Sequence, residues 1–99
     1  MARWVWDPRK ARANLRDHKV SFDLAQRVFG DPEIMSRRDP YPGEERWQSI
    51  GRPSSASEVV LFVVHTEPVR RSEGEEVGRI ISARKATAHE RRAYEEGEY

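Results

Sequence analysis

The stretch EVVLFVVHT, residues 58–66, is the most hydrophobic run in the chain and decides its fold class. Its valines and Phe62 favour an extended backbone, and an apolar run of this length is typical of a central strand. The run VGRIISARKA, residues 77–86, predicts the last strand, and residues 33–38 and 45–51 predict two more. Turn-forming residues separate these segments, so we expect a four-stranded antiparallel sheet.

A short apolar strand, WVWDP at residues 4–8, leads into the first predicted helix. Asp7 is a good N-cap and Pro8 fits the first helical position, so we expect a helix that reaches Asp17. Ser21 caps a second helix, which ends at the GDP turn of residues 30–32.

The C-terminal segment predicts one more helix. Thr87 and Glu90 have the spacing of a capping box, in which each side chain bonds the backbone of the other residue. The order of elements is therefore a short strand, two helices, four antiparallel strands and a helix, which predicts an α+β fold.

The first helix has two stripes that bear on function. Ala11, Leu15 and His18 share one stripe, which we expect to be buried. Lys10, Asn14 and His18 share the adjacent edge. His18 is therefore expected where a buried stripe meets a polar edge.

Composition limits the classes of protein that this chain can form. It has 99 residues, of which 36% are hydrophobic and 35% charged, so we expect a single domain, residues 1–99, with one modest core. The chain has no cysteine, which excludes disulfides and thiolate metal sites. No apolar run approaches the roughly 18 residues of a membrane span, and the N-terminus lacks a signal-peptide apolar region. We expect a soluble cytoplasmic protein without a cofactor.

Positive charge gathers in two segments although the net charge is only +1. Residues 3–19 carry six basic side chains against two acidic ones, and residues 79–92 carry five against Glu90. If the two segments adjoin, they form a basic face that attracts phosphate groups. An ordinary solvated surface with internal ion pairs explains the same charges equally well. In a regular last strand, Arg79 and Arg84 point to opposite faces unless a bulge intervenes.

Several chemistries are disfavoured by the residues present. The three histidines lack metal-ligand spacing, Ser21 near His18 is more simply a helix cap, and no phosphate-binding glycine loop occurs. RNA cleavage demands less of the protein, because the 2′-hydroxyl of RNA is itself the nucleophile. The enzyme then supplies a base, an acid and cations for the phosphorane. Suitable side chains are Lys10, His18, Glu45, Arg46, Arg79 and Arg84.

Each of these candidates also has a structural explanation. His18 at a helix boundary suits a packed or capping residue, Glu45 and Arg46 suit a cross-strand ion pair, and Arg84 suits a helix-carbonyl partner. The residues therefore permit a ribonuclease site without demanding one.

Four motifs occur in order along nearly the whole chain: WDPRKARANLRDHKVSF (6–22), AQRVFGDP (25–32), GEERWQSIGR (43–52) and RIISARKATAHERRAYEE (79–96). Together they resemble the BrnT family of bacterial type II toxins. The resemblance implies a RelE-like fold and a ribonuclease that stops translation by cleaving RNA. It also implies a BrnA-like ribbon-helix-helix antitoxin, through which the complex would bind operator DNA and which would cover the basic face with acidic and apolar residues.

Five residues at positions that match the family pattern are expected to be catalytic. Our hypothesis is that Lys10 or Glu45 acts as general base and His18 as general acid or orienting group. Arg84 is the first candidate for stabilising the phosphorane, and Arg79 is the second. The expected RNA-binding residues are Arg46, Lys85, Arg91, Arg92 and Tyr94.

Three features depart from the family pattern. Lys19 replaces a usual glycine, the loop of residues 67–78 is extended, and His65 stands at a tyrosine-like position. A non-catalytic module that binds nucleic acid or the antitoxin is the alternative.

Overall fold

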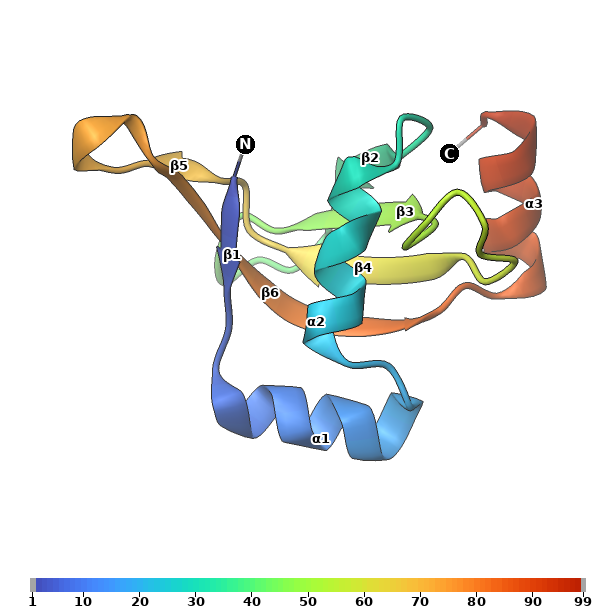
Figure 1. Cartoon of the computed structure of the whole chain (residues 1–99), viewed down its shortest axis with the longest axis horizontal. Coiled ribbons are helices and arrows are strands. Elements are labelled where there is room, and N and C mark those ends of the chain that lie inside the picture. The colour runs from blue at the N-terminus through green and yellow to red at the C-terminus, as the bar shows by residue number, and fades with distance from the viewer. Residues whose placement is uncertain (1, 99) are drawn as a thin grey trace.

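A mixed β-sheet runs through the middle of the molecule in the computed structural model, which describes residues 2–98 (Figure 1). Its strands lie in the order β1-β6-β4-β3-β2, and β5 pairs with the start of β6. The strands are β1 (Arg3–Val5), β2 (Met35–Arg38), β3 (Trp47–Gly51), β4 (Leu61–His65), β5 (Val69–Arg70) and β6 (Glu76–Lys85).

The α+β prediction is confirmed, but the sheet is larger and less regular than predicted. β2, β3, β4 and β6 pair antiparallel, whereas β1 joins β6 in parallel from Arg3↔Val77 to Val5↔Arg79. The segment expected to be a long charged loop contains β5 and folds back on β6 as a projecting hairpin (Figure 1). A two-residue strand in a charged segment has no hydrophobic pattern by which to predict it.

The helices begin at the residues that their caps predict. They are α1 (Pro8–His18), α2 (Phe22–Ala25), which continues as the 3-10 helix η1 (Gln26–Gly30), and α3 (Ala88–Glu96), with a further 3-10 turn, η2 (Ser72–Gly74), in the hairpin. Asp7 accepts a hydrogen bond from the Arg9 N–H, Ser21 accepts one from Leu24, and Thr87 forms the predicted capping box. No helix within residues 2–98 is long and apolar enough to cross a membrane.

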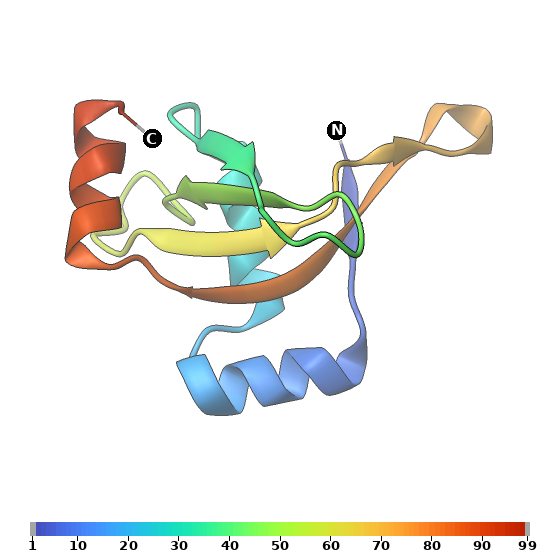
Figure 2. The same ribbon diagram turned by 180° about the vertical axis from the view of Figure 1, so that it is seen from behind.

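The main core lies between the sheet and the α1–α2 layer. It contains Val20, Phe22, Ala25 and Val28 from the helical layer and Leu61, Val63, Ile80 and Ala83 from β4 and β6. A smaller cluster of Ile50, Val60 and Tyr94 joins α3 to the other end of the sheet. Figure 2 shows the sheet from behind, with α3 standing beyond the ends of its strands.

The expected buried stripe on α1 is wrong except at Ala11, which is partly buried against the core. Leu15 is 50% exposed and His18 is exposed, whereas Asn14 is buried. The reason is that α1 lies along the edge of β6, where β1 pairs only as far as Arg79. Asn14 faces this edge and satisfies its backbone: its amide donates to the Ala83 carbonyl at 2.7 Å and accepts from the Ala83 N–H at 3.1 Å.

Candidate functional site

A β-bulge in β6 places two arginines of the predicted site on one face. Val64 pairs with Ser82 while the next residue, His65, pairs with Ile80, so β6 carries one extra residue at this point. Ile80 and Ala83 are both buried in the helix-side core. Their outer neighbours Arg79 and Arg84 consequently point to the opposite side of the sheet, which a regular strand would not allow.

We call this opposite side the open face. Besides the two arginines it carries Gln48 from β3, Val64 from β4 and Ser82 from β6, which are cross-strand neighbours. Strand geometry separates Arg79 from Arg84 by roughly 15 Å along β6. The open face therefore has two basic positions, one at each end.

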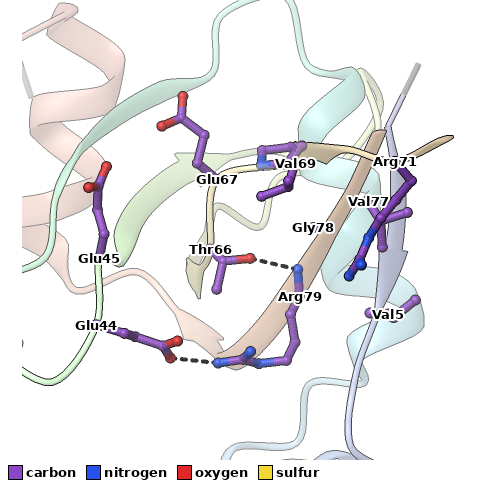
Figure 3. A pocket seen from close by; sticks show the side chains of 11 residues that line it. Val5, Glu44, Glu45, Thr66, Glu67, Val69, Arg71, Val77, Gly78 and Arg79 are labelled. Atoms are coloured by element: carbon purple, nitrogen blue, oxygen red, sulfur yellow. Dashed lines mark hydrogen bonds and ion pairs between the residues drawn. The ribbon is translucent and has the colours of Figure 1, made fainter. Parts of the chain in front are cut away.

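A cleft of about 690 Å³ opens at the Arg79 end (Figure 3). One wall is the loop before β3, and the other is the chain that enters β5. Its lining residues are Val5, Glu44, Glu45, Thr66, Glu67, Pro68, Val69, Arg71, Val77, Gly78 and Arg79. Of the predicted catalytic residues, the structure brings Glu45 and Arg79 together in this cleft.

Arg79 is fixed in the cleft from both its backbone and its side chain. Its N–H donates to the Thr66 hydroxyl at 2.9 Å, and its carbonyl accepts from the Thr66 N–H at 2.9 Å. Its guanidinium binds Glu44 (Figure 3). Glu44 also accepts a hydrogen bond from Arg46 Nε at 3.0 Å. The Arg46 guanidinium in turn stacks 3.8 Å from the centre of the Tyr41 ring. Arg79 is thus held in place while its side chain remains 43% exposed.

Two adjacent glutamates play different parts in this cleft. The hydrogen bond from Arg46 and the charge of Arg79 lower the pKa of the Glu44 carboxyl, which is therefore ionised at neutral pH. Glu45 lies 3.6 Å from Arg38 in an exposed ion pair. A pair of this kind contributes little and opens readily, which leaves the Glu45 carboxylate available as a proton acceptor.

Arg84 marks the other end of the open face. Its guanidinium lies 4.0 Å above the Phe62 ring and forms a two-pronged ion pair with Glu90, at 2.7 and 2.9 Å. Glu90 also accepts from the Thr87 N–H as part of the capping box. The Arg84 hydrogen bond is the largest cause that lowers the pKa of the Glu90 carboxyl. This pair joins β6 to the start of α3.

The structure places Lys10 and His18 outside the cleft lining. Both are exposed on α1, one turn to either side of Asn14. Because α1 and β6 run in the same direction (Figure 1), Lys10 lies toward Arg79 and His18 toward Lys85. Helix geometry separates the two by about 12 Å, so they cannot serve one phosphate side by side in this arrangement.

The predicted RNA-binding residues also separate. Arg46 lies beside the cleft, and Arg91 and Arg92 are exposed on α3. Lys85 is paired with Leu61 on the helix side of the sheet, away from the open face. Tyr94 is 5% exposed and donates its hydroxyl hydrogen to Asp31 at 2.6 Å, so we leave it out of the candidate site.

Glu44 and Thr66 hold Arg79 but were not identified as site residues from the sequence. Glu44 directly precedes Glu45, and two neighbouring glutamates before a strand give no sign of which one turns toward β6. Thr66 directly follows β4, and only the bulge brings it against Arg79. Among residues 2–98, no group of three histidine, aspartate or glutamate side chains is arranged to hold a metal ion.

A buried polar chain lies behind the cleft. His65 is 5% exposed; its Nδ1 is 2.8 Å from the Thr66 carbonyl, and its Nε2 is 2.6 Å from the Ser49 hydroxyl. A carbonyl only accepts, so Nδ1 carries the hydrogen and Nε2 accepts from Ser49. Ser49 in turn pairs with Ser36 at 2.7 Å. The chain of hydrogen bonds therefore ends on Thr66, the residue that fixes Arg79.

Comparison with known protein families identifies the family of this chain. Residues 6–90 match the model of a family described as the ribonuclease toxin BrnT of type II toxin–antitoxin systems. No curated protein matches the chain. The matched segment begins directly after β1 and includes α1, the whole open face and the start of α3. The chain therefore belongs to the BrnT family of ribonuclease toxins.

Proposed function

We propose that this chain is a metal-independent endoribonuclease that cleaves RNA laid along the open face. The scissile phosphate binds at Arg79, and Arg84 binds a phosphate further along the strand. A BrnA-like ribbon-helix-helix antitoxin neutralises the enzyme, and the fold belongs with the RelE-like toxins. The observation that carries the proposal is the bulge, since it turns Arg79 and Arg84 to one face, where Arg79 lines the same cleft as Glu45.

In the proposed reaction the RNA supplies its own nucleophile. Glu45 takes the proton of the 2′-hydroxyl, the 2′-oxygen forms a bond to phosphorus, and the bond from phosphorus to the 5′-oxygen breaks. Arg79 stabilises the additional negative charge on the phosphorane. Lys10, which lies outside the cleft lining on the Arg79 side of Asn14, approaches the cleft when RNA binds and donates the proton that the leaving 5′-oxygen needs. The products are a 2′,3′-cyclic phosphate and a 5′-hydroxyl end.

In this scheme His18 and Arg84 act away from the bond that breaks. His18 lies toward the end of β6 that carries Arg84, so it orients the RNA strand and leaves proton transfer to Lys10. Lys10 as the base, with His18 as the acid, is the other assignment of roles. It requires α1 to approach the cleft when RNA binds.

Cleavage of end-labelled RNA by the purified protein in excess EDTA tests this function. We expect fragments that end in a 2′,3′-cyclic phosphate, and a fall of about 10²-fold or more in rate for Arg79→Ala and Glu45→Gln. Arg27→Ala is the matched control, because this exposed arginine lies in the helical layer. Loss of cleavage in EDTA that returns with Mg²⁺ would contradict the metal-independent mechanism.

One observation favours the alternative of a non-catalytic binding module. Glu44 binds Arg79 and Glu90 binds Arg84, so each arginine is partly neutralised within the chain. A binding module would leave RNA intact, and Arg84→Ala would weaken its RNA affinity without changing any product. Ribosome-associated messenger RNA is the second substrate to test, because intact free RNA alone does not separate a binding module from a toxin that acts on the ribosome.

A further inference from the structure

A second cavity lies on the helix side of the sheet and shares no lining residue with the cleft. It is a hollow of about 270 Å³ between the α1–α2 junction, the ends of β4 and β6, and the loop of residues 53–59. Its lining residues are Lys19, Val20, Leu24, Arg27, Pro53, Ser54, Ser57, Val59, Leu61 and Lys85. We call it the rear hollow.

The rear hollow is apolar at its centre. Val20 and Leu61 are buried beneath it, while Leu24 and Val59 are each 37% exposed. Leu15, which is 50% exposed, lies one helical turn before Lys19 at the rim. Large apolar side chains that remain exposed in one place mark a surface that another molecule covers.

The rim of the rear hollow is basic. Lys19, Arg27 and Lys85 surround the apolar centre. Arg27 has an exposed partner, Asp23, at 3.8 Å, whereas the described residues offer the Lys85 ammonium no ion pair or hydrogen bond. This pattern fits a partner segment that presents apolar side chains flanked by carboxylates, and it does not fit a phosphodiester strand, which has no apolar group for the centre.

The conformation of Lys19 supports the interpretation of this rim as a binding surface. It adopts the left-handed conformation, with φ of 62°, at the end of α1, where glycine would cost about 1 kcal/mol less. Its ammonium donates a hydrogen bond to the Arg16 carbonyl at 3.0 Å. This hydrogen bond offsets part of the conformational cost and keeps the positive charge at the rim. A strained residue that keeps a charge beside an exposed apolar surface is a reason to look for a ligand there.

We infer that the rear hollow is an anchor site for the antitoxin, which inserts an apolar side chain of an acidic amphipathic segment between Lys19 and Lys85. The inference rests on the family's antitoxin partnership and not on the cleavage chemistry. Arg84 and Lys85 are neighbours on opposite faces of β6, so a segment anchored here needs only to pass the end of that strand to reach the open face.

Affinity for a BrnA-like antitoxin tests the anchor site, with isothermal titration of the purified proteins as the measurement. We expect Val59→Glu to weaken binding at least about 30-fold, because it puts a carboxylate in the apolar centre and opposite an acidic partner. The matched control is Arg12→Gln, which changes the net charge by the same amount and lies on the exposed side of α1, outside the lining of both cavities. It should bind within about threefold of wild type.

Lys19→Gly separates binding from folding. Glycine relieves the positive φ, so the thermal midpoint should hold or rise while antitoxin affinity falls severalfold and depends less on salt. Equal effects of Val59→Glu and Arg12→Gln, or wild-type affinity in both Val59→Glu and Lys19→Gly, would overturn the inference. RNA cleavage is measured on the same variants, so failure of the ribonuclease proposal and failure of the anchor site are distinguished.

Discussion

The side-chain amide of Asn14 makes the two hydrogen bonds to Ala83 that a neighbouring strand would make. It also donates to the Val20 carbonyl at 2.9 Å, so one buried residue of α1 holds both β6 and the start of α2. These hydrogen bonds also affect the candidate site, because Ala83 lies between the bulge and Arg84. The edge of β6 is thereby fixed where the two arginines of the open face need a rigid strand.

Asn14→Ala should therefore destabilise the fold by about 2–4 kcal/mol, because the Ala83 N–H and carbonyl lose their partner in a buried place. Urea unfolding at neutral pH measures this change. Arg12→Ala on the exposed side of the same helix should change the free energy of unfolding by less than about 0.5 kcal/mol. A similar small change in Asn14→Ala would mean that water replaces the amide at this edge.

Glu44→Gln should strengthen RNA binding. The substitution removes the negative charge beside Arg79 but keeps a side chain of the same shape, so the guanidinium meets the RNA phosphate without a competing carboxylate. We expect the dissociation constant to fall about two- to fivefold at low salt and its salt dependence to steepen. Fluorescence anisotropy of a labelled, non-cleavable RNA across a salt series measures both.

Glu75→Gln is the control for that experiment. Glu75 also pairs with an arginine, Arg3, but it lies on the hairpin outside the cleft lining. If both substitutions tighten RNA binding equally, net charge alone explains the effect and Arg79 has no special part in it.

Glu90→Gln should reduce the free energy of unfolding at neutral pH by about 1–2 kcal/mol. We expect no larger loss, because the Arg84 side chain is 35% exposed and solvent screens the ion pair. The folded-state pKa of Glu90 is lowered, chiefly by Arg84, so its contribution is complete above the unfolded-state pKa of about 4.5 and is lost as the pH falls through the folded-state value. The variant should therefore differ from wild type at pH 7 and converge with it in acid. Glu95→Gln, which breaks an exposed pair with Arg91, should change stability by less than about 0.5 kcal/mol.

The parts of this fold that sequence predicts are those set by local chemistry. Asp7, Ser21 and Thr87 cap helices where expected, since a cap needs only its own side chain and the next turn of backbone. The bulge between Arg79 and Arg84 depends on how β6 pairs with a strand far away in the chain, which no local pattern records.

The residues of the candidate site likewise fall into some that the sequence predicts and others that it does not. Arg79 and Glu45 could be selected by residue type, and the structure joins them in one cleft. Lys85 and Tyr94 have suitable chemistry too, but the strand alternation and the Asp31 hydrogen bond turn them elsewhere. α1 forms where it is predicted, yet a polar residue, Asn14, faces inward because the edge of β6 offers it hydrogen bonds in place of apolar contact.

His65 should make the protein less stable in mild acid. Burial lowers the pKa of its imidazole, and the hydrogen bond to the Thr66 carbonyl offsets part of that effect. The unfolded chain therefore binds a proton at higher pH than the folded one, so stability falls as the pH drops below the unfolded-state value of about 6.5. The loss is at most about 1.4 kcal/mol for each pH unit. Protonation would also put a hydrogen on Nε2, against the Ser49 hydroxyl that now donates to it.

The measurement is urea unfolding of wild type and His65→Phe between pH 7.5 and 5.5, above the range in which Glu44 and Glu90 titrate. Phenylalanine keeps a ring against Trp4 and Phe29, whose ring centres lie 5.2 and 4.8 Å from that of His65. It removes the titrating group, so we expect a less stable protein whose free energy of unfolding changes less over this interval than that of wild type. An equal acid dependence in His65→Phe would assign the effect to another group and would show that the buried chain from Ser49 to Thr66 does not respond to pH.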